Sequence, residues 1–195
     1  MNQTPTIDPK HTALLVMDYQ NAMVNQMANQ ELLAKMAPTI QFARDNGIHV
    51  GYVWVAFNED DYQAIPETNK VFASIGDQKM LHHEAPESQI HAELEPQTGD
   101  IVVRKIRFGA FSTTDLDEQL KAKDIDTLIL TGISTSGVVL STTREAADRD
   151  YRIYVLKDLT ADHNDEVHKT LTEHVLPMQA YVISTAELPE LLQKA

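Results

Sequence analysis

Two charged residues follow apolar runs of strand length, and both have side chains suited to proton chemistry. Asp18 comes directly after the apolar run 13–17, and Lys105 comes directly after the run 101–104. In a parallel sheet the carboxyl ends of the strands converge on a crevice where ligands bind. We therefore expect Asp18 and Lys105 to meet over a pocket. There the carboxyl group could act as a general acid or base, and the ammonium group could stabilise a developing anion.

Each of the two residues also has a simpler explanation. Aspartate is a favoured helix cap, so Asp18 could serve only the helix that follows it. An isolated lysine in a loop between a strand and a helix is usually solvated, which would describe Lys105. The two could also form a buried ion pair kept for structure alone.

A turn of small residues, 132–137, follows a further apolar run. Ser134, Thr135, Ser136 and Gly137 bring hydroxyl groups and backbone N–H groups to the start of a predicted helix. Such a turn can hold an oxyanion or a carboxylate, although helix capping alone would explain any one of the hydroxyl residues. The Gly-x-Ser-x-Gly pattern of serine hydrolases is absent, but Ser134 and Ser136 remain candidate nucleophiles.

Other residue types limit the chemistry further. The sequence contains no cysteine, which removes thiolate nucleophiles and zinc–thiolate sites. Its eight histidines, His82 and His83 among them, show no compact spacing such as His-Glu-x-x-His, so we expect no catalytic metal and no cofactor. Aromatic residues near strand ends are more often core than ligand contacts. The side chains that could line a pocket are Gln20, Trp54, Phe57, Tyr62, Phe108 and Phe111.

The composition is that of an ordinary globular protein. The 195 residues suit a single domain spanning 1–195, with 43% hydrophobic and 23% charged residues and no internal repeat. A net charge of -13, without a basic stripe, argues against nucleic-acid binding. No run is long enough to cross a membrane and the amino terminus does not read as a signal peptide, so we expect a cytoplasmic protein acting on a small molecule.

Apolar runs alternate with segments of helical periodicity, which predicts a three-layer α/β/α fold around a mainly parallel sheet. Six runs read as buried strands: 13–17, 49–56, 101–104, 127–131, 152–156 and 180–184. Three segments read as helices: 21–46, 114–123 and 138–149. Gly47 is placed to end the first helix in a left-handed conformation. The polar segment 58–95 interrupts the alternation, and a connection of this length usually serves a site or a partner.

With these motifs in place, the chain resembles the isochorismatase-like hydrolases, also called the cysteine hydrolase family. Three segments carry the resemblance in the same order: 15–21 with Asp18, 102–116 with Lys105, and 130–142 with the turn described above. The resemblance implies a Rossmann-like sheet flanked by helices and a homo-oligomer, dimeric or larger. It also implies a cis peptide bond between Ile133 and Ser134, and an Asp, Lys, Cys triad in the amidase members.

Asp18 and Lys105 fall on the first two triad positions, but Val138 falls on the third. Valine has no heteroatom that could attack a carbonyl group, so covalent cysteine chemistry is excluded there. Family members resembling true isochorismatases also lack the cysteine, and their aspartate is thought to protonate a vinyl ether. Three alternatives stay open: a hydrolase using Asp18 and Lys105, an amidase using Ser134 or Ser136, and a pseudoenzyme that binds a small molecule or acts as an oligomeric scaffold.

Overall fold

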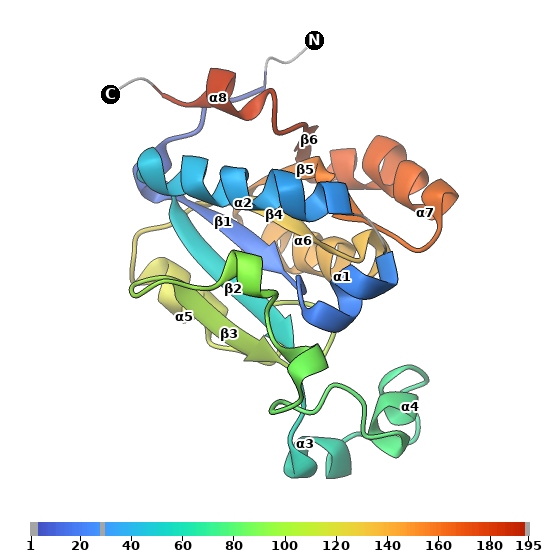
Figure 1. Ribbon diagram of the computed structural model, residues 1–195. Helices are drawn as coiled ribbons and strands as arrows, with labels where there is room; N and C mark the ends of the chain where they lie inside the picture. Colours follow the sequence, from blue (N-terminus) through green and yellow to red (C-terminus); the bar gives the residue numbers. More distant parts are fainter. Residues whose placement is uncertain (1–3, 28–29, 194–195) are drawn as a thin grey trace.

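The computed structural model describes residues 4–27 and 30–193, and a six-stranded sheet forms its centre (Figure 1). The strands are β1 (Thr12–Met17), β2 (His49–Val55), β3 (Ile101–Lys105), β4 (Thr127–Ile133), β5 (Arg152–Ala161) and β6 (Tyr181–Ile183). All six predicted strands are confirmed. They form because runs rich in valine, isoleucine and leucine can be buried on both faces of a parallel sheet.

Every strand pair is parallel, in the order β3-β2-β1-β4-β5-β6. The two directions of winding meet at β1, which pairs with β2 on one side and with β4 on the other. Carboxyl ends of strands at such a switch point form the usual ligand crevice of an open α/β sheet. The order therefore places the end of β1, which carries Asp18, at the centre of that edge.

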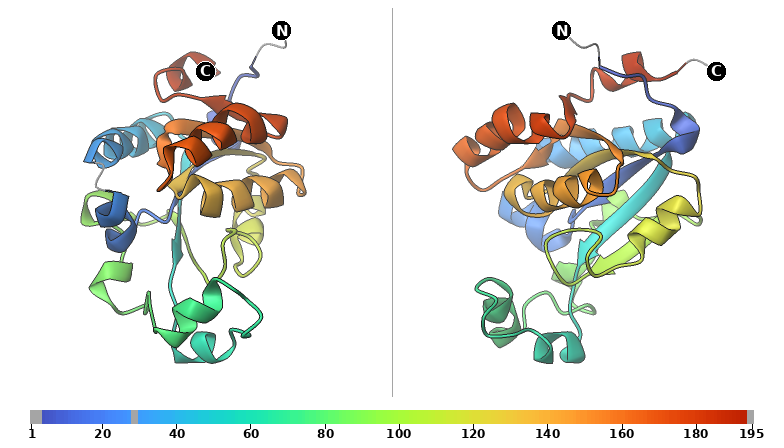
Figure 2. Two further views of the ribbon diagram at one scale, coloured as in Figure 1. Left: turned by 90° about the vertical axis from the view of Figure 1, so that its right-hand side faces the viewer. Right: turned by 180° about the vertical axis from the view of Figure 1, so that it is seen from behind.

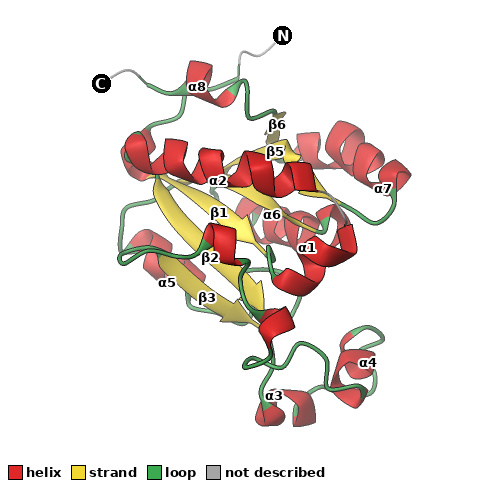
Figure 3. Cartoon of the chain, viewed as in Figure 1, coloured by secondary structure: helices red, strands yellow, loops and turns green. Residues whose placement is uncertain are grey.

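Helices cover both faces of the sheet and give the predicted three layers (Figures 2 and 3). The helices are α1 (Asn21–Met27), α2 (Gln30–Asp45), α3 (Glu59–Gln63), α4 (Phe72–Asp77), α5 (Leu116–Lys121), α6 (Leu140–Ala147), α7 (Asp165–Thr170) and α8 (Leu188–Leu191). Val24 of α1 and Ile40 of α2 pack in an apolar cluster on one face. Leu120 of α5 and Ala146 of α6 pack in a second cluster on the opposite face.

The described residues of the first predicted helix, 21–46, lie almost entirely in the helices α1 and α2. Residues 28–29 lie outside the described part of the chain. The predicted stop is confirmed: Gly47 has a φ of 78°, and its N–H donates to the carbonyl oxygen of Arg44 at 3.1 Å. The other two predicted helices are shorter than expected, since α5 and α6 end two residues earlier.

Most of the segment 58–95 forms a small lobe beyond the carboxyl end of β2, containing α3 and α4 (Figure 1). Its last residues return along the sheet, where Leu94 packs in the same apolar cluster as α2. An apolar cluster of Val55, Phe57, Tyr62 and Phe72 holds the lobe on the sheet. The rings of Phe57 and Tyr62 stack at a centroid distance of 5.6 Å. The lobe therefore has its own core next to the carboxyl edge of the sheet.

None of the helices in the described residues is long and apolar enough to cross a membrane.

Candidate active site

Asp18 and Lys105 form a buried ion pair at the carboxyl edge of the sheet. Lys105 Nζ lies 2.9 Å from Asp18 Oδ2, and only 2% and 7% of the two side chains is exposed. The strands that carry them are not neighbours, because β2 lies between β1 and β3. Lys105 pairs with Val55, the last residue of β2, so the lysine side chain reaches across β2 to meet the aspartate. The predicted meeting of the two groups is confirmed.

Strand alternation explains the direction of the lysine. Ile101, Val103 and Lys105 are all buried, whereas Val102 is exposed, so the three share one face of β3. Arg104 points to the other face, because neighbouring side chains in a strand alternate. Its guanidinium group donates to Asp61 Oδ2 of the lobe at 2.6 Å.

The backbone at Asp18 turns sharply out of β1. The residue has a φ of 57°, in the left-handed region that aspartate tolerates better than most residues. Its N–H still donates to Val53 O at 2.8 Å and so extends the ladder between β1 and β2 by one bond. Within the described residues, Oδ2 pairs with Lys105 and Oδ1 has no hydrogen-bond partner. The carboxylate therefore caps no helix there.

The surroundings of the pair raise the proton affinity of the Asp18 carboxyl group. Burial raises the pKa of Asp18 above its ordinary value, because removal from water penalises the charged form. The positive charge and hydrogen bond of Lys105 oppose this effect without cancelling it. The unpartnered Oδ1 acts in the same direction, since an ionised carboxylate would lack donors at that oxygen. Lys105 Nζ is held from its other side by Arg107 O at 3.1 Å.

Val138 places an apolar side chain at the third position of the triad that the family resemblance implies. Its side chain is buried, and Cγ1 lies 3.1 Å from where a Cβ atom on Gly132 would stand. The carbonyl oxygen of Met17, the residue before Asp18, lies equally close to that point. Glycine at position 132 is therefore needed for the close approach of β1, β4 and the turn. The side chain of Val138 packs beside the end of β1 and offers no nucleophile.

The turn that leads to Val138 is anchored by its own side chains. The Ile133–Ser134 peptide bond is cis, as the family resemblance implies. Ser134 Oγ accepts a hydrogen bond from Gly137 N at 3.1 Å, and a π-helical turn (Thr135–Val139) leads into α6. Ser134 thus acts as the cap that the simpler interpretation allows.

Two further contacts at this turn involve residues that the sequence did not point out. Thr135 Oγ1 and His168 Nδ1 of α7 lie 2.8 Å apart, and Ser136 N donates to Asp162 Oδ2 at 2.7 Å. The partners lie 33 and 26 residues away along the chain, so no local pattern could have indicated them. In the described residues no histidine bonds to the hydroxyl group of Ser134 or Ser136.

The residues considered for a pocket wall lie in different surroundings. Gln20 is fully buried: it donates to Val55 O at 2.8 Å and to Ser88 O at 2.6 Å, and it accepts from Val55 N at 2.9 Å. Phe57 lies in the core of the lobe. Phe111 lies in the cluster beneath α5 and α6.

Trp54 is half-buried on β2, and Phe108 lies beside the turn. Phe108 Cδ1 lies 3.7 Å from where a Cβ atom on Gly137 would stand, and its ring meets that of Phe72 in α4 at 4.9 Å. At 44% exposure, Phe108 joins the lobe to the turn while one side remains open to solvent.

Comparisons with known proteins agree with this architecture. The model of the isochorismatase domain family matches residues 12–187. YwoC, an uncharacterised isochorismatase family protein of Bacillus subtilis, is 31% identical over 191 residues, covering 97% of this chain and 98% of that protein. An isochorismatase of the same organism is 27% identical over 189 residues, covering 96% of this chain and 60% of its own length. A cysteine hydrolase structure from Pseudomonas syringae pv. phaseolicola has the same fold, with a TM-score of 0.85 at 23% identity and 97% coverage of both chains.

Proposed function

Because this chain belongs to the isochorismatase family of hydrolases, we propose that it hydrolyses a small metabolite with Asp18 as general acid and without a covalent intermediate. The observation that carries the proposal is the buried contact between Asp18 and Lys105. A carboxyl group whose pKa is raised by burial keeps its proton at higher pH than a solvated one, which suits an acid catalyst.

The reaction that fits these groups is vinyl ether hydrolysis. Asp18 gives its proton to the terminal carbon of the vinyl group, and the adjacent carbon becomes an oxocarbenium-like centre. Water adds to that centre, and one of its protons restores Asp18. The other proton passes to the alcohol oxygen as the carbon–oxygen bond to the alcohol breaks, so that a ketone and an alcohol are released. Lys105 stabilises the carboxylate that exists between the two proton transfers.

Val138 supports a route without a thiolate. Acyl transfer by the amidase members needs a nucleophile at that position, and a valine side chain cannot form the acyl intermediate. An amidase using Ser134 or Ser136 has less support, since Ser134 Oγ is the cap of the turn and Ser136 is exposed. A binding protein without catalysis stays the main alternative, because a buried ion pair can also serve structure alone.

The test is a substrate screen with matched variants. Wild type is assayed against isochorismate, by coupled detection of pyruvate, and against a panel of amides. Asp18→Asn is the test variant. Asp100→Asn is the control, because it breaks a different ion pair, Arg44 with Asp100 at 2.6 Å, away from the Asp18–Lys105 contact. Circular dichroism at the assay temperature establishes that each variant is folded.

We expect turnover of a vinyl ether substrate that falls by about 100-fold or more in Asp18→Asn, the usual share of a general acid, and is unchanged in Asp100→Asn. Full activity in folded Asp18→Asn would refute the role of Asp18. Binding of panel members with no hydrolysis of any would favour the binding protein, and a covalent adduct on Ser134 or Ser136 detected by mass spectrometry would favour the amidase.

A further inference from the structure

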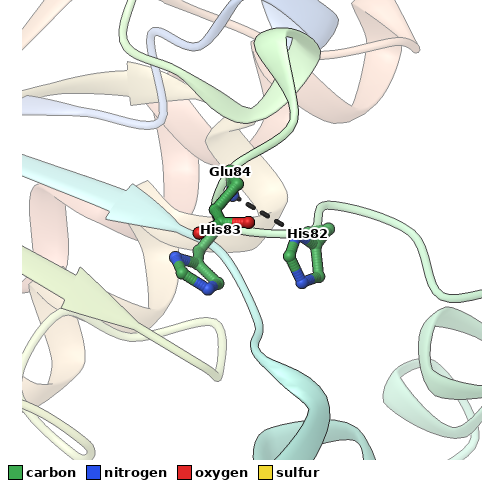
Figure 4. Close-up of side chains that lie close together, drawn as sticks. All are labelled: His82, His83 and Glu84. Atoms are coloured by element: carbon green, nitrogen blue, oxygen red, sulfur yellow. Dashed lines mark hydrogen bonds between the residues drawn. The ribbon is translucent and has the colours of Figure 1, made fainter.

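Three potential metal ligands lie together in the lobe, outside the Asp18–Lys105 pair. His82, His83 and Glu84 follow α4 in a loop (Figure 4), and each offers one ligand atom within 4.8 Å of the others. The two imidazoles are half-buried and the carboxylate is exposed. These ligands adjoin one another on a loop, unlike those of the helical pattern His-Glu-x-x-His, in which one helix turn separates the two histidines.

The backbone that carries these side chains is fixed to the end of β2. Phe57 N donates to Leu81 O, and His83 N donates to Phe57 O, both at 2.9 Å. Ala85 N closes a turn on His82 O at 2.9 Å. The side chain of Phe57 lies in the core of the lobe, so the loop rests on a packed support. The cluster is therefore held in place before any ligand arrives, which lowers the entropy cost of binding.

The donor atoms in the cluster are largely uncommitted. In the described part of the chain, the side chains of His83 and Glu84 make no hydrogen bond or ion pair. His82 Nδ1 accepts from Glu84 N at 3.4 Å, a distance at which a hydrogen bond is weak and costs little to give up. The imidazole rings of His82 and His83 lie with centroids 4.8 Å apart.

The neighbouring carboxylates add negative charge without competing for the role of ligand. Glu59 and Asp61 of α3 lie close enough to His82 and His83, respectively, for each imidazole to interact electrostatically with its carboxylate. Both carboxylates are already paired: Glu59 with Lys79 at 2.7 Å, and Asp61 with Arg104 at 2.6 Å.

From this geometry we infer that His82, His83 and Glu84 form a binding site for a divalent transition metal ion of the zinc class. Two imidazoles and one carboxylate are a common zinc ligand set, and water completes the coordination. Tetrahedral zinc with bonds of about 2.0–2.1 Å needs ligand atoms roughly 3.4 Å apart. Rotation of the exposed Glu84 side chain and a small shift of the imidazoles bring the three atoms within that range. The site is separate from the proposed hydrolysis, which uses no metal.

The test is calorimetric titration of the full chain, free of any affinity tag and of chelator, with zinc chloride. We expect one zinc ion per chain. His82→Ala and His83→Ala should each weaken binding at least about 10-fold, since loss of a direct ligand costs no less than loss of its supporting groups. Glu84→Gln, an exposed substitution that leaves the fold intact, should also weaken binding.

His91→Ala is the matched control. His91 Nδ1 accepts from Glu93 N at 3.3 Å, the same local arrangement as at His82, but no second histidine adjoins it. This variant should bind zinc as wild type does. Absence of zinc binding by wild type would overturn the inference, as would wild-type affinity in the folded double variant His82→Ala/His83→Ala. Nitrogen hyperfine splitting from two imidazoles on bound Cu²⁺, lost in the double variant, is the second readout.

Discussion

Replacing Asp18 by asparagine should destabilise the protein because it leaves the ammonium group of Lys105 buried without its counter-charge. Lys105 is 2% exposed and would keep only the carbonyl oxygen of Arg107 and the new amide as partners. Removing one member of a buried ion pair typically costs about 3–5 kcal/mol. For a chain of this size, with about 2–4 °C per kcal/mol, the melting temperature should fall by about 6–20 °C.

A double-mutant cycle separates the interaction of the pair from other effects. Lys105→Met removes the charge but keeps most of the side-chain volume, so Asp18→Asn/Lys105→Met should recover part of the stability lost in Asp18→Asn. The expected coupling is at the upper end of the range of about 0.5–3 kcal/mol found for residues in contact. Urea unfolding followed by circular dichroism measures all four proteins.

The control is Asp100→Asn, whose pair with Arg44 is more exposed, at 11% and 20%, and should cost less. Additive losses below about 1 kcal/mol for Asp18→Asn and Lys105→Met would show that the two groups do not depend on one another. That result would refute the conclusion that Asp18 and Lys105 form a buried and energetically coupled ion pair.

Three further predictions concern the same edge of the sheet. The pKa of Asp18 is raised in the folded state, so the contribution of Asp18 to stability is full at low pH and is lost as pH rises through the folded pKa. Lys105→Met removes the charge that opposes this rise, so the loss of stability that this variant shows in urea unfolding should grow with pH. A loss of stability that shrinks with pH would contradict this. Gln20→Ala removes three buried hydrogen bonds to Val55 and Ser88 and should cost about 2–4 kcal/mol in urea unfolding; a loss under about 1 kcal/mol would mean that water replaces the amide. Val138→Ala should cost about 2 kcal/mol through lost apolar burial and a small cavity, and an unchanged melting temperature would show that the side chain is not tightly packed.

The strands were predictable because a strand that is buried on both faces of a sheet needs a continuous run of apolar residues. The same physics explains the errors of length. β5 extends to Ala161, five residues beyond the predicted end, although Lys157 and Asp158 interrupt its apolar run. At these residues the pairing with β4 shifts register, from Leu130 with Val155 to Gly132 with Thr160, and it resumes only for the last two residues of β5. Such an irregularity has no apolar pattern that could be recognised in the sequence. The start of the helix predicted at 138–149 differs for a related reason. A π-helical turn (Thr135–Val139) precedes α6, and its apolar residues Val138 and Val139 continue the apolar pattern of the helix.

The central pair of the site was predictable because strand ends in a parallel sheet share one edge. Asp18 and Lys105 each follow an apolar run, and topology alone brings them together. The contact between Thr135 and His168 was not predictable, because it joins a turn to a helix 33 residues further along the chain, and no local sequence pattern marks such a pair. The position of Phe108 between the lobe and the turn likewise depends on how segment 58–95 folds back, which its polar composition does not specify.

The pH profile of kcat/KM for wild type and Lys105→Met, measured side by side on the substrate found in the screen, tests the role of Asp18 most directly. If protonated Asp18 is the acid, the rate is high at low pH and falls as pH rises through a midpoint above the ordinary value for aspartate, about 3.9. In Lys105→Met that midpoint should move to higher pH, because the charge that lowers the pKa is gone. A rate that rises with pH across this range, or a midpoint that Lys105→Met leaves in place, would contradict the account.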